Sequence, residues 1–188
     1  MELSVVIPAK NEEQGLARLL PNQRELYPEA DIIVVDDGSS DSTAKVCKDA
    51  GVRVISHPYS KGNGAAIKAG ARAARGDSIV FMDGDGQHDP QDIARLLYCM
   101  DEGYDLVVGA RSGLADQASV VRWSANSLYN KLAGWMVNSQ IPDLTSGFRC
   151  VNRKKFLDFL YLLPNGFSYP TTSTMAFFRA GYSVGFVP

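Results

Sequence analysis

Short apolar runs alternate with helical segments along the first 110 residues of the chain. The runs with the composition of buried strands occupy residues 3–9, 30–37, 52–56, 78–82 and 104–110. The helical segments between them occupy residues from 12 onward, 40–51, 62–76 and 89–103. Strands that are apolar throughout, each followed by a helix, are typical of a parallel sheet covered by helices on both faces. The pattern therefore predicts an α/β fold with a mostly parallel sheet.

Local residue choices support several of these segments. Gly51 ends the second helical segment, and Asp89 followed by Pro90 gives the fourth an N-cap and a preset first turn. The third segment carries small residues on one face, namely Gly64, Ala65, Ala66, Ala69 and Gly70. We interpret this small-residue face as the sign of close packing between helix and sheet.

The pattern becomes looser after residue 111. A helix is expected over residues 119–138, followed by the segment IPDLTSGFRCV, a second helix and a final segment YSVGFVP. One face of the first helix is apolar and consists of Leu128, Leu132, Trp135 and Met136. We interpret this face as packing against the core. The alternative is a surface helix that touches a bilayer, with Trp123 and Trp135 at the level of the headgroups.

Composition and charge exclude several classes of protein. A length of 188 residues suits one domain, so we expect a single domain over residues 1–188. The formal net charge of −2 gives no electrostatic footprint for nucleic acid. The three cysteines never form a C-x-x-C pair, which favours reduced thiols and argues against a zinc site. No apolar run reaches the roughly 18 residues of a spanning helix, and the N-terminus lacks the layout of a signal peptide, so we expect a soluble chain.

Polar clusters follow three of the predicted strands. They read PAKNEE from residue 8, DDGSSDS from residue 36 and DGDGQHD from residue 83. Each could be an ordinary strand-to-helix turn, because Asp, Asn, Gly and Ser favour turns and helix caps. In open α/β sheets, however, ligands bind outside the carboxyl ends of the strands. Three acidic or amide clusters at that edge indicate a cleft suited to a hard cation with oxygen ligands.

The D-x-D pair formed by Asp83 and Asp85 fits other motifs poorly. An EF-hand counted from Asp83 would need glycine and glutamate where the chain has His88 and Ala94. The first turn lacks the G-x-G-x-x-G of a dinucleotide-binding module and the glycine-rich, arginine-bearing loop of a nucleotidyltransferase. A phosphatase with an aspartyl nucleophile would normally open the fold with its D-x-D strand, whereas here another acidic pair comes first.

Six segments together resemble the family 2 glycosyltransferases, which have the nucleotide-diphospho-sugar transferase (GT-A) fold. They are VVIPAKNEE, IIVVDDGSSDST, KGNGAAIKAG, FMDGDGQHDP, VVGARS and DLTSGFR, in the family's order and at its spacings. More narrowly, the chain resembles the polyprenyl-phosphate sugar synthases of the dolichol-phosphate mannose synthase group. The resemblance implies a nucleotide-sugar-binding half over residues 1–110 and an acceptor half over residues 111–188. Relatives continue beyond the final GFVP, which implies a catalytic domain truncated at its C-terminus.

The resemblance implies a donor site at the ends of the first, second and fourth strands. The donor-binding residues that it implies are Pro8, Ala9, Asn11, Glu12, Asp36, Asp37, Lys61, Gly62, Asp83 and Gly84. It also implies Asp83, Asp85 and Gln87 as ligands of Mg²⁺ or Mn²⁺, with Asp85 counted among the catalytic residues. Such a metal would explain why two carboxylates end one strand, since a departing nucleoside diphosphate builds up negative charge. For Lys61 the alternative is a solvated surface position.

The later motifs are implied to hold an acceptor phosphate. Arg111, Arg122 and Arg149 match family arginines that face phosphate groups, which the planar guanidinium binds well. The alternatives are a surface charge for Arg122 and a structural ion-pair partner for Arg149. Asp143 is the candidate base. A phosphate acceptor is already ionised near neutral pH, so Asp143 could instead orient the acceptor or hold an arginine. The segment YPTTSTMAFF departs from the family, because it has threonine and serine where an acidic residue is usual.

The function implied by the resemblance is an inverting transfer of a hexose from a UDP- or GDP-linked donor to a polyprenyl phosphate. This reaction would take place in the cytoplasm, at the cytoplasmic face of a membrane. Two alternatives stay open: the same fold acting on a saccharide or protein hydroxyl, and a non-catalytic module that binds a nucleotide sugar.

Overall fold

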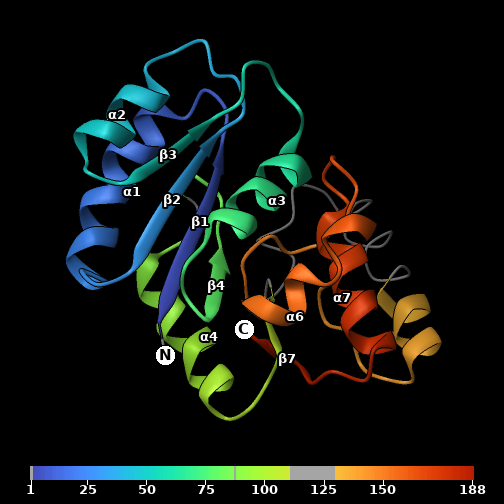
Figure 1. Ribbon diagram of the computed structural model, residues 1–188. Helices are drawn as coiled ribbons and strands as arrows, with labels where there is room; N and C mark the ends of the chain where they lie inside the picture. The colour runs from blue at the N-terminus through green and yellow to red at the C-terminus, as the bar shows by residue number, and fades with distance from the viewer. Residues whose placement is uncertain (1, 87, 111–129) are drawn as a thin grey trace, which may run out of the picture.

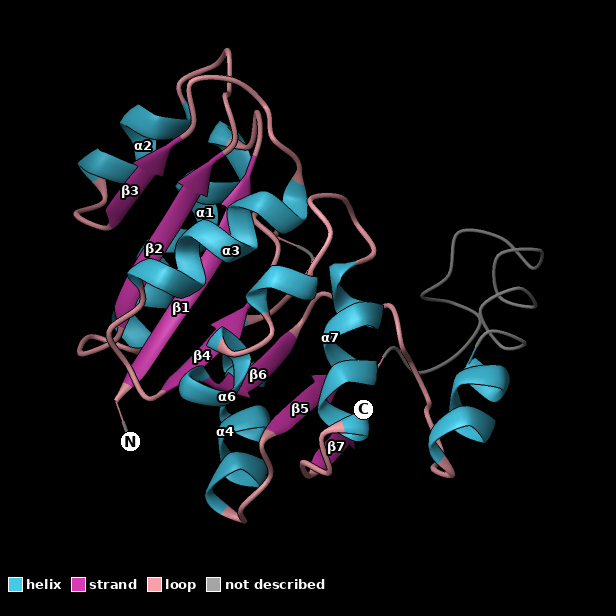
Figure 2. Cartoon of the chain, turned by 45° about the vertical axis from the view of Figure 1, so that its right-hand side comes forward, coloured by secondary structure: helices cyan, strands magenta, loops and turns pink. Residues whose placement is uncertain are grey.

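The computed structural model describes residues 2–86, 88–110 and 130–188 of the chain. Within these residues, seven strands form one sheet in the order β3-β2-β1-β4-β6-β5-β7 (Figure 2). The strands are β1 Leu3–Ala9, β2 Asp31–Asp36, β3 Arg53–Ser56, β4 Ser78–Phe81, β5 Leu106–Gly109, β6 Arg149–Asn152 and β7 Val184–Val187. All five apolar runs of the sequence are therefore strands, and the mostly parallel α/β fold is confirmed.

The apolar pattern did not predict strands β6 and β7. Strand β6 lies between β4 and β5 and runs antiparallel to both, whereas β7 pairs parallel to β5 at the sheet edge. β6 is only four residues long and begins with the charged Arg149, so it does not stand out as an apolar run. Because β6 enters the sheet between strands of the first 110 residues, the two sequence halves share one sheet.

Helices cover both faces of the sheet, as Figures 1 and 2 show. They are α1 Glu13–Leu26, α2 Thr43–Asp49, α3 Asn63–Ala73, η1 Pro90–Asp92, α4 Ile93–Asp101, α6 Arg153–Leu157, η3 Leu160–Leu162 and α7 Tyr169–Arg179. Alternate residues of β1 enter different cores, since Val5 and Ile7 pack with α1, α2 and α4, and Val6 packs with α3, α6 and α7. A fully buried side chain of this size contributes about 1.5–3 kcal/mol, so the central strands hold the two layers together.

The start and the packing of individual helices follow local chemistry. The Asp89 carboxylate accepts a hydrogen bond from the Gln91 N–H at 2.9 Å, which confirms the predicted N-cap. Gly70 confirms the predicted close contact of α3 with the sheet, because a β-carbon there would lie 2.3 Å from a methyl carbon of Val6. The small residues of α3 therefore have a packing role at this position.

The helix over residues 130–137 differs from its prediction. Leu132, Trp135 and Met136 are 53%, 82% and 59% exposed, so the interpretation of this face as core packing is wrong for these three residues. The buried contact of the helix is made by Ala133, which clusters with Ile141 and Leu144. Leu128 and Trp123 lie outside the described residues. Within the described part of the chain, no helix is both long enough and apolar enough to cross a membrane.

Candidate active site

The turns that follow β1 and β2 are joined by hydrogen bonds. Asn11 takes up a left-handed backbone conformation with a φ of 58°, which asparagine tolerates better than most residues. Its N–H donates to Ser39 Oγ at 2.9 Å, and its side-chain Oδ1 accepts from the Ser40 N–H at 2.8 Å. The side chain of Asn11 therefore fixes the position of the second turn.

The glutamates next to Asn11 extend the same connection. The Glu12 N–H donates to Thr43 Oγ1 at 2.9 Å, and Glu13 accepts from the Ser42 N–H at 2.9 Å. Asp41 accepts hydrogen bonds from both the N–H and the hydroxyl of Thr43 at the start of α2. Turn and cap chemistry thus accounts for much of the PAKNEE and DDGSSDS clusters, and it also brings them together at one edge of the sheet.

Asp36 and Asp37 are both only 5% exposed. Asp36 accepts from the Ser39 N–H at 2.9 Å. Asp37 is bonded to the loop over residues 57–62: His57 Nδ1, Ser60 Oγ, and the N–H groups of Lys61 and Gly62 all lie within 2.9 Å of its carboxylate oxygens. Burial by itself raises the pKa of Asp37, but these four hydrogen bonds lower it to about 2. Asp37 is therefore ionised at neutral pH.

The other residues that the resemblance implies for donor binding lie around these turns. Pro8 and Ala9 are buried at the end of β1, where the Ala9 carbonyl accepts from the Asp37 N–H at 2.8 Å. Gly84 is also buried and packs toward Leu16. The Lys61 side chain is exposed, and its Nζ lies 5.6 Å from the centre of the Tyr59 ring.

The D-x-D pair follows β4, beside the first turn. Burial raises the pKa of Glu12, and the nearby negative charges of Asp85, Asp41 and Asp83 raise it further. The Asp83 side chain is 43% exposed, and His88 Nε2 lies 3.9 Å from its Oδ2. Carboxylates from two strand ends are thus close enough to repel one another, a situation that a bound cation would relieve.

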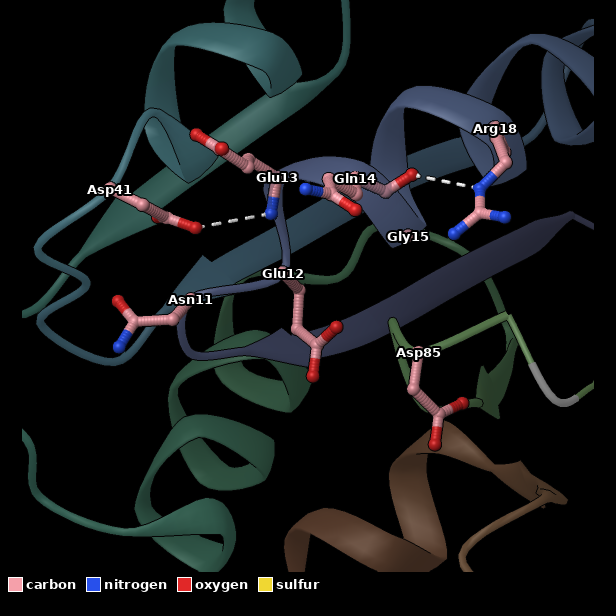
Figure 3. Close-up of a pocket in the computed structure, with 8 residues that line it drawn as sticks. All are labelled: Asn11, Glu12, Glu13, Gln14, Gly15, Arg18, Asp41 and Asp85. Atoms are coloured by element: carbon pink, nitrogen blue, oxygen red, sulfur yellow. Dashed lines mark hydrogen bonds between the residues drawn. The ribbon is translucent and has the colours of Figure 1, made fainter.

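A pocket of about 290 Å³ opens between the carboxylates of Glu12, Asp41 and Asp85 and the start of α1 (Figure 3). Its lining residues are Asn11, Glu12, Glu13, Gln14, Gly15, Arg18, Asp41 and Asp85. Four of these eight residues are acidic and Arg18 is the one cation among them. A second pocket of about 370 Å³ shares Gly15, Arg18 and Asp85 with the first and continues toward His88 and Pro90.

The residues at this edge fit a divalent cation with oxygen ligands. Asp83 and Asp85 supply carboxylate oxygens, which suit Mg²⁺ or Mn²⁺. Gly147 leaves space beside Asp83, since a β-carbon there would lie 3.3 Å from Asp83 Oδ2. Among the described residues, no three His, Cys, Asp or Glu side chains are arranged to hold a metal by themselves. Gln87, the third ligand implied by the resemblance, lies outside the described residues.

Asp143 organises the turn that precedes β6. It is 5% exposed, and its Oδ1 accepts from the N–H groups of Thr145 and Ser146 at 2.9 and 3.1 Å. The Thr145 hydroxyl lies 3.1 Å from the same oxygen. One oxygen of the candidate base is therefore occupied by the local turn.

Arg149 requires a correction, because its guanidinium is fully buried and cannot reach an acceptor phosphate in this structure. Its Nε and Nη2 donate to the Ser146 carbonyl, and its Nη1 donates to the Pro170 carbonyl at 2.9 Å and to the hydroxyls of Ser173 and Thr174 at 3.0 Å. Burial lowers its pKa to about 10, so the group remains cationic at neutral pH. Arg149 fits the structural alternative, with carbonyl and hydroxyl partners from α7. Arg111 and Arg122 lie outside the described residues.

Sequence reasoning missed several residues that shape the site. Arg18 lines both pockets but has no distinguishing sequence context. Gly147 belongs to the DLTSGFR motif and lies beside Asp83 in the folded chain. The glycine in this motif was a sequence signal that could have indicated the close approach. The turn at Pro164 and Asn165 packs against the start of α3, a contact that only the folded chain creates.

The chain is similar to known glycosyltransferases over most of its length. The family model described as glycosyl transferase family 2 matches residues 4–160. An undecaprenyl-phosphate 4-deoxy-4-formamido-L-arabinose transferase of Proteus mirabilis is 37% identical over 154 residues, covering 77% of this chain and 44% of the relative. An undecaprenyl-phosphate mannosyltransferase of Micrococcus luteus is 31% identical over 206 residues, covering 100% of this chain and 82% of the relative.

Solved structures agree with this similarity. The crystal structure of glucosyl-3-phosphoglycerate synthase from Mycobacterium tuberculosis, in complex with Mn²⁺, UDP and phosphoglyceric acid, superposes with a TM-score of 0.76. It is 27% identical, and the match covers 99% of this chain and 68% of that one. The chain spans only 44–61% of the length of several of the curated relatives that it matches.

Proposed function

This chain belongs to glycosyltransferase family 2, and on that premise we propose that it catalyses the inverting transfer of a hexose from a nucleotide-diphosphate sugar to a polyprenyl phosphate. The observation that carries the proposal is the match over the whole chain to an undecaprenyl-phosphate mannosyltransferase, together with the acidic edge of the sheet. In the proposed reaction a phosphate oxygen of the acceptor attacks the anomeric carbon, while the bond from that carbon to the nucleoside diphosphate breaks.

The donor side of the proposal rests on the turns at the ends of β1, β2 and β4. We assign Asp83 and Asp85 as the protein's ligands to Mg²⁺ or Mn²⁺, with further ligands from the diphosphate of the donor. When bound, the cation would stabilise the negative charge on the departing nucleoside diphosphate. Support comes from the solved relative that contains Mn²⁺ and UDP, and from the raised pKa of Glu12 beside these carboxylates.

On the acceptor side, Asp143 serves as a positioning residue. A phosphate acceptor is ionised at neutral pH and needs no strong base. The three hydrogen bonds that Asp143 Oδ1 accepts from residues 145 and 146 support this role, because they hold the turn between Asp83 and β6. We place the acceptor phosphate near Arg111 and Arg122 and the reaction at the cytoplasmic face of a membrane, in line with the named acceptors of the curated relatives.

A binding experiment tests the donor and metal assignments. UDP and GDP are titrated into the protein by calorimetry, with and without Mn²⁺, and one of the two nucleotides is expected to bind in a metal-dependent way. Asp85→Asn should abolish the Mn²⁺-dependent part of the affinity, because the amide removes a charged metal ligand. Asp101→Asn is the matched control, since Asp101 is exposed at the end of α4. Unchanged Mn²⁺-dependent affinity in Asp85→Asn would overturn the metal assignment.

A transfer assay tests the acceptor. The protein is incubated with radiolabelled nucleotide sugars and either a short-chain prenyl phosphate in detergent, a saccharide or 3-phosphoglycerate. The last is included because a solved relative was crystallised with phosphoglyceric acid. Product on the prenyl phosphate alone is expected. Transfer to either of the other acceptors in its place would contradict the proposed function.

A further inference from the structure

Four hydrogen-bond donors of the loop over residues 57–62 contact the carboxylate of Asp37. Asp37 Oδ1 lies 2.7 Å from His57 Nδ1 and accepts from the Lys61 N–H at 2.8 Å. Its Oδ2 accepts from Ser60 Oγ at 2.8 Å and from the Gly62 N–H at 2.9 Å. A carboxylate offers about four acceptor positions, so these contacts use its full capacity.

The turn at Pro164 and Asn165, in the proposed acceptor half of the chain, packs against the other side of this loop. A β-carbon on Gly62 would lie 2.4 Å from the Asn165 carbonyl oxygen, and one on Gly64 would lie 2.1 Å from the Pro164 carbonyl oxygen. The Ala65 N–H donates to the Asn165 carbonyl at 3.2 Å. The backbone from Gly62 to Ala65 therefore fits between Asp37 and this turn without room to shift.

His57 is placed to fix the carboxylate end of this arrangement. Its N–H donates to the Asp36 carbonyl at 2.8 Å, and its side chain is only 9% exposed. Because Asp37 is ionised, Nδ1 must carry a hydrogen and donate it to the carboxylate. Removing this donor would free Asp37 Oδ1 to move and would loosen the Lys61 contact on the same oxygen.

We propose that His57 is a positioning residue for donor binding, which acts through Asp37 to hold the Lys61–Gly62 segment in the donor site. In this arrangement Asp37 anchors the loop that borders the donor site. The inference rests on the proposed function, since it takes the donor to be a nucleotide sugar bound beside this loop.

The test compares two substitutions at one position. His57→Leu removes the hydrogen-bond donor and puts an apolar side chain in its place, whereas His57→Asn keeps an N–H near the position of Nδ1. Loss of one hydrogen bond to a charged group is expected to raise the KM for the donor by about tenfold in His57→Leu, with kcat within about twofold. His57→Asn should restore KM to within about threefold of wild type. A purely structural role would not give this division between KM and kcat or this rescue.

Ser4→Ala is the matched control for lost stability. Ser4 Oγ accepts from the N–H groups of Arg75 and Gly76 at the opposite end of β1, far from the donor turns. This variant should lower the melting temperature without changing the donor KM. All kinetic measurements are made well below the melting temperature of each variant. An unchanged donor KM in folded His57→Leu would overturn the proposal, and so would a KM in His57→Asn as high as in His57→Leu.

Hydrogen exchange provides a readout that needs no donor. The amides of Lys61 and Gly62 donate to Asp37, so His57→Leu should speed their exchange by about tenfold or more. Unchanged exchange would overturn the anchoring step. If wild type binds neither UDP nor GDP, the proposed function fails together with the donor role of His57, while the exchange rates still decide whether His57 anchors the loop.

Discussion

Replacing Asp37 by asparagine should destabilise the protein in a pH-dependent way. The four hydrogen bonds to its carboxylate outweigh the effect of burial and lower the pKa from 3.8 to about 2. This difference corresponds to about 2.5 kcal/mol of folding free energy at neutral pH. In Asp37→Asn the amide nitrogen replaces one acceptor oxygen and faces two donors, so we expect the loss of about this amount.

The sign of the pH dependence follows from the lowered pKa. A carboxyl group with a lower pKa in the folded state stabilises the protein above pH 3.8, and this contribution is lost as the pH falls through about 2. At pH 3 about half of it should remain, so the stability difference between wild type and Asp37→Asn should shrink from about 2.5 to about 1.3 kcal/mol. The asparagine side chain does not titrate in this range. The change in the stability difference therefore comes from protonation of Asp37 in the wild type.

Urea unfolding followed by circular dichroism at pH 7, 5 and 3 measures this difference. Other carboxylates also titrate in this range, but they contribute equally to both proteins and cancel in the comparison. Asp49→Asn, at the exposed end of α2, is the control and should stay within about 0.5 kcal/mol of wild type at every pH. A stability difference that stays constant from pH 7 to pH 3, or one below about 0.5 kcal/mol at pH 7, would refute the reasoning about Asp37.

Two further predictions concern arginines that the sequence assigned to the acceptor phosphate. Arg149→Met should lower the unfolding free energy by about 1–3 kcal/mol, because the Ser146 carbonyl loses its hydrogen-bond donors, although removal of a buried charge offsets part of the loss. If urea unfolding shows no loss of stability while prenyl transfer falls, Arg149 contacts the acceptor after all. Arg122 lies outside the described residues, and Arg122→Ala should reduce transfer to a prenyl phosphate by about 10–150-fold, since a bidentate phosphate contact contributes about 1.5–3 kcal/mol. Nucleotide affinity should change much less. Equal losses in calorimetry and transfer would assign Arg122 to the donor diphosphate.

The helix α3 contacts a turn formed by residues 163–165, in the second half of the chain. The Lys68 ammonium donates to the Leu163 carbonyl at 2.9 Å and to Asn165 Oδ1 at 2.6 Å, beside the contacts of Gly62 and Gly64 with the same turn. That turn leads into α7, whose Tyr169 hydroxyl lies 3.4 Å from the Gly147 carbonyl, next to Asp83. The segment that begins α3 and the D-x-D edge are therefore both in contact with residues 163–169.

The sequence by itself determined the elements that depend on local patterns. Apolar runs of five to eight residues gave all five of the strands in the first 110 residues, because a strand buried on both faces must be apolar throughout. Asp89 and Pro90 marked the start of a helix for a reason that involves only neighbouring residues. The grouping of three polar clusters at one edge also followed, since the strands are parallel and their carboxyl ends meet there.

Tertiary structure alone decided the partners of the polar side chains. Arg149 was matched to an acceptor contact, but β6 lies inside the sheet and encloses its guanidinium with carbonyls and hydroxyls from α7. Asp37 was implied to bind the donor, and only the folded chain shows that the loop over residues 57–62 brings four hydrogen-bond donors to its carboxylate. Leu132 and Trp135 repeat at helical spacing like core residues, yet they face solvent because Ala133 makes the contact with the core. Spacing along a helix or strand defines which residues share a face, whereas burial and hydrogen bonding depend on segments far apart in the chain.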